Sequence, residues 1–225
     1  MSSIRKKPTA LIKILEQFAK VLRRDRFLLF NSLISTLPRP VNVLDLGGRQ
    51  KFWEDMNFTE EADINLTILN LEKVEVTKPN FRSLVGDTRK LPDLKSQEFD
   101  VVFSNSVIEH VGDYQQQSQM VEEIKRLGKR YFIQTPNYFF PIEPHFLFPC
   151  FQFFPLYLKV FILLNFGAGW YKKVDNQQEA VEVANSINLL TEHKIRSLFP
   201  EAIIYKEKLF GLTKSFIAYS GWNKQ

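Results

Sequence analysis

Short apolar runs alternate with segments of helical periodicity through the first two thirds of the chain. The runs are rich in Val, Ile, Leu and Phe, which suits strands that are covered on both faces of a parallel sheet. They fall at 43–46, 66–71, 81–85, 99–104 and 130–134. Between the last two, 115–127 repeats apolar residues at helical spacing, and Gly128 closes that helix. This alternation predicts an α/β fold with right-handed βαβ units and a mostly parallel sheet.

Both ends of the chain add elements to this core. Apolar residues at helical spacing predict one or two helices over 8–37, which Pro38 and Pro40 terminate. Near the other end, Thr191 is a suitable N-cap for a helix that runs to Phe199. Two closing strands, 202–209 and 215–219, are expected to form an antiparallel hairpin.

The strand pattern lapses between 138 and 188, where phenylalanines and prolines crowd together. A membrane-spanning helix needs ~20 predominantly apolar residues, and Gln152, Lys159 and Asn165 interrupt this stretch. We therefore expect an aromatic-rich cap inserted over the edge of the sheet, with one helix over 155–165. The expected division is an arm (1–40), a core (41–137 with 189–225) and the cap (138–188).

Charge is concentrated in the amino-terminal arm. Residues 1–40 carry nine Lys or Arg against two Asp or Glu, which is +7 and leaves about −2 of the total +5 for the remaining chain. The arm either packs on the body or lies in a membrane interface with Arg23, Arg24 and Arg26 near anionic lipid. A nucleic-acid partner is not expected, because the body is slightly acidic.

Candidate chemistry begins at the end of the first predicted strand. Asp45 is followed by Gly47 and Gly48, which allow a tight turn where backbone amides approach a ligand closely. A helix can start at Arg49, so its positive end would face the same ligand. Strand, glycine turn and helix together indicate a nucleotide-type site at the carboxyl edge of the sheet.

The order of these signals resembles class I S-adenosylmethionine-dependent methyltransferases, and more narrowly the type 11 small-molecule group. The resemblance implies a Rossmann-like, seven-stranded sheet with helices on both faces, parallel except for the last strand of the chain. It also implies S-adenosylmethionine as cofactor. The first motif of this chain departs from the family pattern, because Arg49 and Lys51 stand where the family usually has further glycines.

The resemblance assigns cofactor contacts to four strand ends. The turn after the first strand would face the methionine part. After the second strand, Asn70 occupies the place of the usual ribose-binding acid, and we favour nearby Glu72 for that role because a carboxylate accepts two hydroxyl hydrogen bonds. The other expected contacts are Asp87 and Thr88 for adenine, and Asn105 and Ser106 near the transferred methyl group.

Methyl transfer to an oxygen benefits from a general base, and two histidines are candidates. His110 lies in the Glu-His-Val ending of the stretch from Phe99 to Val111, which resembles the family's fourth motif. His145 belongs to a Glu143-Pro144-His145 segment in which the glutamate can orient the imidazole. The single cysteine, Cys150, excludes a Cys-rich zinc site, and no metal site is predicted. The acceptor is expected to be a small molecule, a glycan or a lipid-linked compound.

Two other functions stay open at this point. A nicotinamide-dependent oxidoreductase is compatible with the glycine turn, although no full Gly-x-Gly-x-x-Gly is present. A non-catalytic membrane-surface protein on a methyltransferase scaffold would explain the altered glycines, the basic arm and the phenylalanines. The first residues show no signal-peptide pattern, so a cytoplasmic location with possible peripheral membrane contact is expected. The oligomeric state is left open.

Overall fold

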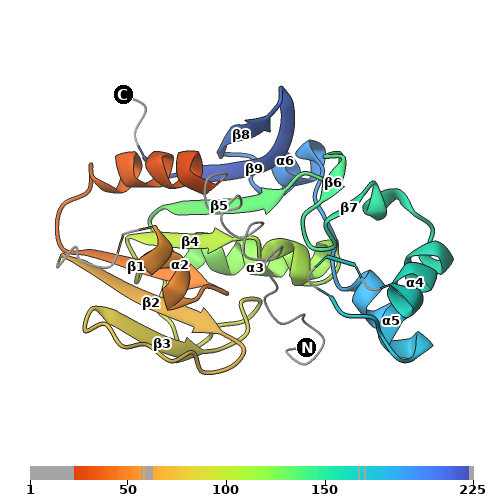
Figure 1. Ribbon diagram of the computed structural model, residues 1–225. Coiled ribbons are helices and arrows are strands. Elements are labelled where there is room, and N and C mark those ends of the chain that lie inside the picture. Colours follow the sequence, from red (N-terminus) through yellow and green to blue (C-terminus); the bar gives the residue numbers. More distant parts are fainter. Residues whose placement is uncertain (1–22, 57, 59–62, 167, 170, 223–225) are drawn as a thin grey trace.

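A seven-stranded sheet forms the centre of the computed structural model, which describes residues 23–56, 58, 63–166, 168–169 and 171–222. The strand order is β3-β2-β1-β4-β5-β9-β8 (Figure 1). The strands are β1 (Val41–Leu46), β2 (Ile64–Asn70), β3 (Phe81–Val85), β4 (Val101–Asn105), β5 (Tyr131–Pro136), β8 (Ile203–Leu209) and β9 (Leu212–Ser220). Neighbouring strands are parallel except around β9, which is antiparallel to both β5 and β8. The expected fold class and closing hairpin are confirmed.

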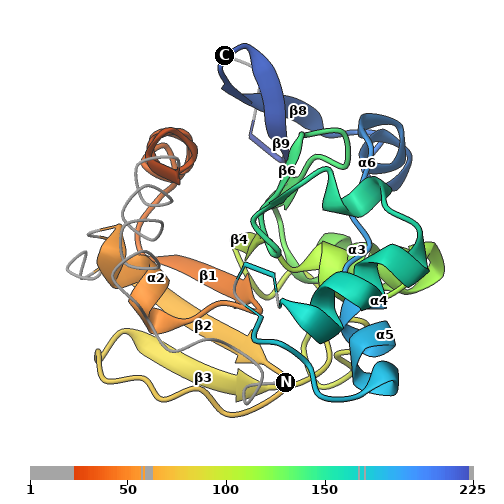
Figure 2. The same ribbon diagram turned by 45° about the vertical axis from the view of Figure 1, so that its right-hand side comes forward.

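Helices cover both faces of this sheet, as Figure 2 shows. A helix whose described part spans 23–34 lies with α2 (Gln50–Asp55) against one face. On the other face lie α3 (Tyr114–Leu127) and α6 (Glu192–Leu198). Each face buries its own apolar cluster, which is why β1, β4 and β5 read as nearly continuous apolar runs.

The amino-terminal helix packs on the sheet through Phe27 and Phe30, which are buried against α2 and β4. Arg26 of this helix is only 6% exposed and makes a buried ion pair with Glu207 of β8 at 2.7 Å. Of the two alternatives for the arm, packing on the body holds for the described helix, and a place for Arg26 near anionic lipid is wrong, because its guanidinium is turned into the protein. The earlier part of the predicted arm, 1–22, lies outside the described residues.

The segment 138–188 lies beyond the tips of β4 and β5, on the side to which their arrows point in Figure 1. It contains a short hairpin of β6 (Ile142–Glu143) and β7 (Phe148–Pro149), then α4 (Leu156–Asn165) and α5 (Gln177–Asn185). Phe146, Phe151 and Leu163 are among the residues of its own buried apolar cluster. Helix α4 agrees with the prediction over 155–165, whereas the hairpin and α5 were not predicted. Within the described part of the chain, no helix has the length and apolar content needed to cross a bilayer.

Candidate active site

The glycine turn after β1 is built around the carboxyl group of Asp45. This side chain is 1% exposed, and Trp53 of α2 donates its Nε1 hydrogen to Asp45 Oδ2 over 2.7 Å. Gly48 lies so close that a Cβ there would stand 1.6 Å from Asp45 Oδ2. Burial raises the pKa of Asp45 to about 7, against which the Trp53 hydrogen bond acts. Asp45 therefore stabilises the turn from inside the protein, through its contacts with Trp53 and Gly48.

Gly47 adopts a φ of +75°, and its amide donates to the Leu69 carbonyl of β2 over 2.7 Å. A left-handed conformation of this kind suits glycine. The turn thus joins the carboxyl ends of β1 and β2, as a nucleotide-type site requires.

Asn70 and Glu72, the two candidates for the ribose, differ in what their side chains already contact. Asn70 Nδ2 donates to the Gly48 carbonyl over 3.3 Å, and its Oδ1 accepts from the Leu71 amide over 2.9 Å. Both ends of the amide therefore hold the backbone of the two loops. Glu72 is exposed at the same edge of the sheet.

Asp87 and Thr88 follow β3, at the outer end of the same edge. Arg89 Nε donates to Asp87 Oδ1 over 2.9 Å, and the Arg89 amide donates to the same oxygen over 2.9 Å. These hydrogen bonds hold the pKa of Asp87 below its usual range. Thr88 is half-buried in this turn. An adenine amine would share the Asp87 carboxylate with Arg89.

Asn105 and Ser106 stand at the end of β4. The Asn105 Oδ1 atom accepts a hydrogen bond from Arg26, so the amino-terminal helix reaches the predicted methyl-transfer region. Ser106 has a φ of +56°, and its hydroxyl donates to Gln134 Oε1 over 3.0 Å. A left-handed backbone at a non-glycine residue is a feature that gathers at functional sites.

The two predicted histidines, which are 35 residues apart, meet beside this edge. His110 lies in the short helix η2 (Ile108–His110), and His145 lies in the β6–β7 loop; their Nε2 atoms are 3.0 Å apart. Glu143 Oε1 is 2.7 Å from His145 Nδ1, and the Glu143 Oε2 atom accepts two backbone amides. Because Glu143 accepts these contacts, we place the hydrogen of His145 on Nδ1. His145 Nε2 then accepts from His110 Nε2.

A second glutamate, Glu109, lies against this pair and was not singled out from the sequence. It is fully buried, and its Oε2 accepts from Thr135 Oγ1 over 2.9 Å. The other oxygen, Oε1, is buried without a hydrogen-bond partner, 3.7 Å from His145 Nε2. Burial raises the pKa of Glu109, and the nearby His145 opposes that shift. The signal in the sequence was its place directly before His110 in the fourth motif.

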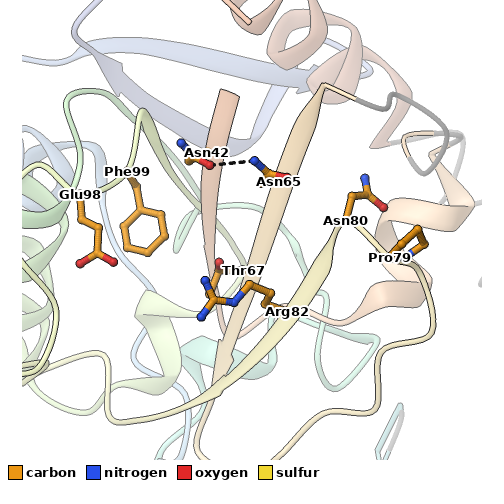
Figure 3. A pocket seen from close by; sticks show the side chains of 8 residues that line it. All are labelled: Asn42, Asn65, Thr67, Pro79, Asn80, Arg82, Glu98 and Phe99. Atoms are coloured by element: carbon orange, nitrogen blue, oxygen red, sulfur yellow. Dashed lines mark hydrogen bonds between the residues drawn. The ribbon is translucent and has the colours of Figure 1, made fainter. Parts of the chain in front are cut away.

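Two cavities differ in their relation to these residues. One, of about 430 Å³, is lined by polar side chains at the amino ends of β1 to β3, including Asn42, Asn65 and Arg82 (Figure 3). This cavity lies at the edge of the sheet opposite the predicted site. The segment 86–100, which connects β3 to β4, contains no helix. The other, of about 210 Å³, lies under the insertion, and Glu143 and Gln152 are part of its wall.

Comparison with known proteins relates about a third of the chain to a known family. The family model Methyltransf_11, described as "Methyltransferase domain", matches residues 54–131. That match begins after the glycine turn, includes the predicted contacts from Asn70 to His110, and ends before His145. An uncharacterised protein of Mycobacterium tuberculosis is 38% identical over 58 residues, which are 26% of this chain and 20% of that protein. The chain thus matches about a fifth of the length of its curated relatives.

Solved structures share the fold at low identity. A SAM-dependent methyltransferase from Aquifex aeolicus has a TM-score of 0.56 and 13% identity, covering 95% of this chain and 98% of its own. Magnesium protoporphyrin IX methyltransferase from Synechocystis PCC 6803, solved with bound SAH, has a TM-score of 0.53 and 14% identity, covering 95% and 88%. The fold and the family match confirm the resemblance to class I, type 11 methyltransferases. The family match supports the expectation of a methyltransferase that uses S-adenosylmethionine.

Proposed function

We propose that this chain transfers a methyl group from S-adenosylmethionine to an oxygen of a small-molecule, glycan or lipid-linked acceptor. The observation that carries the proposal is the family match over 54–131 together with the convergence of the ends of β1 to β4 on one edge. The cofactor supplies the electrophilic methyl group, so the protein has to align an acceptor and receive its proton.

The cofactor site we propose includes Glu72 for the ribose hydroxyls, Asp87 and Thr88 for adenine, and Asn105 and Ser106 near the methyl group. The side-chain contacts of Asn70 favour Glu72, since the Asn70 amide already bonds to Gly48 and Leu71. Asp45, Gly47 and Gly48 fix the turn that faces the methionine part.

Glu72→Gln tests the ribose contact, with Glu75→Gln as a control in the same loop, because both side chains are exposed. Loss of a charge-assisted hydrogen bond costs about 1.5–3 kcal/mol, so Glu72→Gln is expected to weaken binding of S-adenosylhomocysteine by roughly 10- to 100-fold. Glu75→Gln is expected to bind as the wild type does. Equal affinity for both variants, measured by isothermal titration, would remove Glu72 from the site.

The histidine pair supports a proton relay for an oxygen acceptor. In the tautomers given above, His110 Nδ1 carries a lone pair and can take the acceptor's hydroxyl proton as the oxygen–carbon bond forms. The His110 Nε2 hydrogen passes to His145 Nε2 over their 3.0 Å contact. Glu143 and Glu109 then stabilise the His145 imidazolium.

A screen with methyl-labelled S-adenosylmethionine against hydroxyl-bearing small molecules, glycans and lipid-linked compounds tests this relay. On any acceptor that takes the label, His145→Gln is expected to lower turnover by about 10²- to 10⁴-fold. The third histidine of the chain, His193, is outside the cluster, so His193→Gln is the matched control. Unchanged turnover in His145→Gln would exclude the relay.

A further inference from the structure

We propose that Glu109, His110 and His145 form a binding site for one divalent transition-metal ion of the zinc class. One ligand atom from each residue lies within 4.8 Å of the other two. The sequence predicted no metal site, because the ligands come from two segments that only the fold brings together. The proposal stands apart from methyl transfer, since metal binding can be measured without cofactor or acceptor.

The spacing of the ligand atoms suits a tetrahedral ion. Bonds of about 2.0–2.2 Å from zinc to nitrogen or oxygen place neighbouring ligand atoms about 3.3–3.6 Å apart. The two Nε2 atoms are 3.0 Å apart, and His145 Nε2 is 3.7 Å from Glu109 Oε1. Small side-chain shifts therefore bring these atoms to bonding distance of one ion.

Glu109 gives a second, independent indication of a cation. Its Oε1 atom is buried without a hydrogen-bond partner and is directed toward His145. A buried carboxylate oxygen without a partner is costly, and coordination to a cation would offset that cost. Thr135 binds the other oxygen over 2.9 Å, which holds Oε1 toward the histidines.

The surroundings of His145 also match those of metal-bound histidines. Such a histidine usually donates its second ring hydrogen to a carboxylate, which fixes the ring and leaves the ligand nitrogen free of hydrogen. Glu143 provides this carboxylate at 2.7 Å from His145 Nδ1. On metal binding, His110 would move its hydrogen from Nε2 to Nδ1, so that both Nε2 atoms coordinate. The metal-loaded and relay states of the pair are therefore alternatives.

Two neutral imidazoles and one carboxylate favour zinc or cobalt over magnesium or calcium, which prefer all-oxygen sites. Since His110 is exposed, a fourth coordination position can face solvent or an acceptor oxygen. The ion would also tie the β6–β7 hairpin to the end of β4, because His145 belongs to the former and Glu109 follows the latter.

The test uses the full chain, freed of metal with a chelator and titrated with Zn²⁺ or Co²⁺ without cofactor. One ion is expected to bind per chain, with a visible cobalt spectrum of tetrahedral type. His110→Gln and His145→Gln are each expected to weaken zinc binding by at least tenfold. Glu143→Gln, which replaces the carboxylate that orients His145, is expected to weaken it by about 10- to 100-fold.

His193→Gln is the matched control and is expected to bind zinc as the wild type does. Absence of stoichiometric binding by the wild type would overturn the proposal, as would binding that His110→Gln and His145→Gln leave unchanged. A variant at buried Glu109 can fail to fold. His110 is exposed, so His110→Gln is expected to fold and still removes one ligand. If the wild type did not bind S-adenosylhomocysteine in a separate titration, this result would contradict the proposed function and leave the metal site unaffected.

Discussion

Asp45 shows how a motif residue can serve the fold before it serves a ligand. Its carboxyl group is enclosed by Gly48 and Trp53, and burial raises its pKa from 3.8 to about 7. The folded state thus holds this proton more tightly than the unfolded state. The stability that Asp45 contributes is present in full below pH 3.8 and is lost as the pH rises through about 7.

We predict that Asp45→Asn reduces the pH dependence of stability. Between pH 5 and pH 8, the wild-type free energy of unfolding should fall by roughly 2–3 kcal/mol more than that of the variant. The asparagine keeps an acceptor for Trp53, so the turn should be preserved. Urea unfolding of both proteins at both pH values measures this difference. Parallel behaviour of the two proteins would show that Asp45 is not buried as described.

At the scale of residues, the sequence located the strand ends but not their partners. Asp45, Asp87 and Asn105 were placed from motifs that follow apolar runs, and they do lie at one edge of the sheet. Each is bound by a side chain that the motifs do not contain, such as Trp53 for Asp45. The partner of Asn105, Arg26, comes from a distant helix, and spacing along the chain carries no signal for such pairs.

At the scale of elements, the helix over 23–34 is fastened to the sheet by a buried charge pair. Arg26 meets Glu207 with side chains 7% and 2% exposed, and Ser215 also donates to this carboxylate. Arg26 also donates a hydrogen bond to Asn105, so this helix connects β8 with the end of β4. Removing one charge would leave the other buried without its main partner.

We predict that Arg26→Met lowers the free energy of unfolding by about 3 kcal/mol or more. The double variant Arg26→Met with Glu207→Gln should recover part of this loss, because the buried Glu207 charge is removed, although Lys214 then loses its 3.5 Å contact with Glu207. Lys51→Met, which removes a mostly exposed pair with Asp55, is the control and should cost less than about 1 kcal/mol. If the single variant at Arg26 cost no more than the control, the buried pair would not fasten the helix.

The elements that the sequence missed are those with little periodicity. The five parallel strands were found within two residues at each end, and four of them, β1, β2, β4 and β5, are mostly apolar and buried. The start of β9 was placed three residues too late. In contrast, β6 and β7 have two residues each, which is too short for an alternating pattern. Helix α5 is mostly polar and buries only Ala180, Val183 and Ala184, so its apolar stripe is weak. Helix α5 is therefore recognised only in the structure, where it packs against α4.

At the scale of the whole molecule, apolar side chains remain exposed on the insertion. Tyr157 and Phe161 of α4 are 75% and 55% exposed, and Phe166, just past its end, is 72% exposed. Such clusters mark contact surfaces. We propose that this face makes peripheral contact with lipid, which would bring a lipid-linked acceptor to the edge where the strands end.

Tyr157→Ser with Phe161→Ser is predicted to remove most co-sedimentation with lipid vesicles. The control is Phe210→Ser, which changes a 92% exposed phenylalanine on the turn between β8 and β9. This control should bind vesicles as the wild type does. Failure of the wild type to sediment with vesicles, or equal losses in both variants, would rule out lipid contact through α4.

The claim on which the enzymatic account depends is that one cofactor site lies at the carboxyl ends of β1 to β4. A crystal structure of the full chain grown with S-adenosylhomocysteine tests it most directly. The account predicts density for the adenosyl group between Glu72 and Asp87, with the sulfur near Asn105 and Ser106. Density at another place, or crystals free of ligand at millimolar concentration, would contradict it.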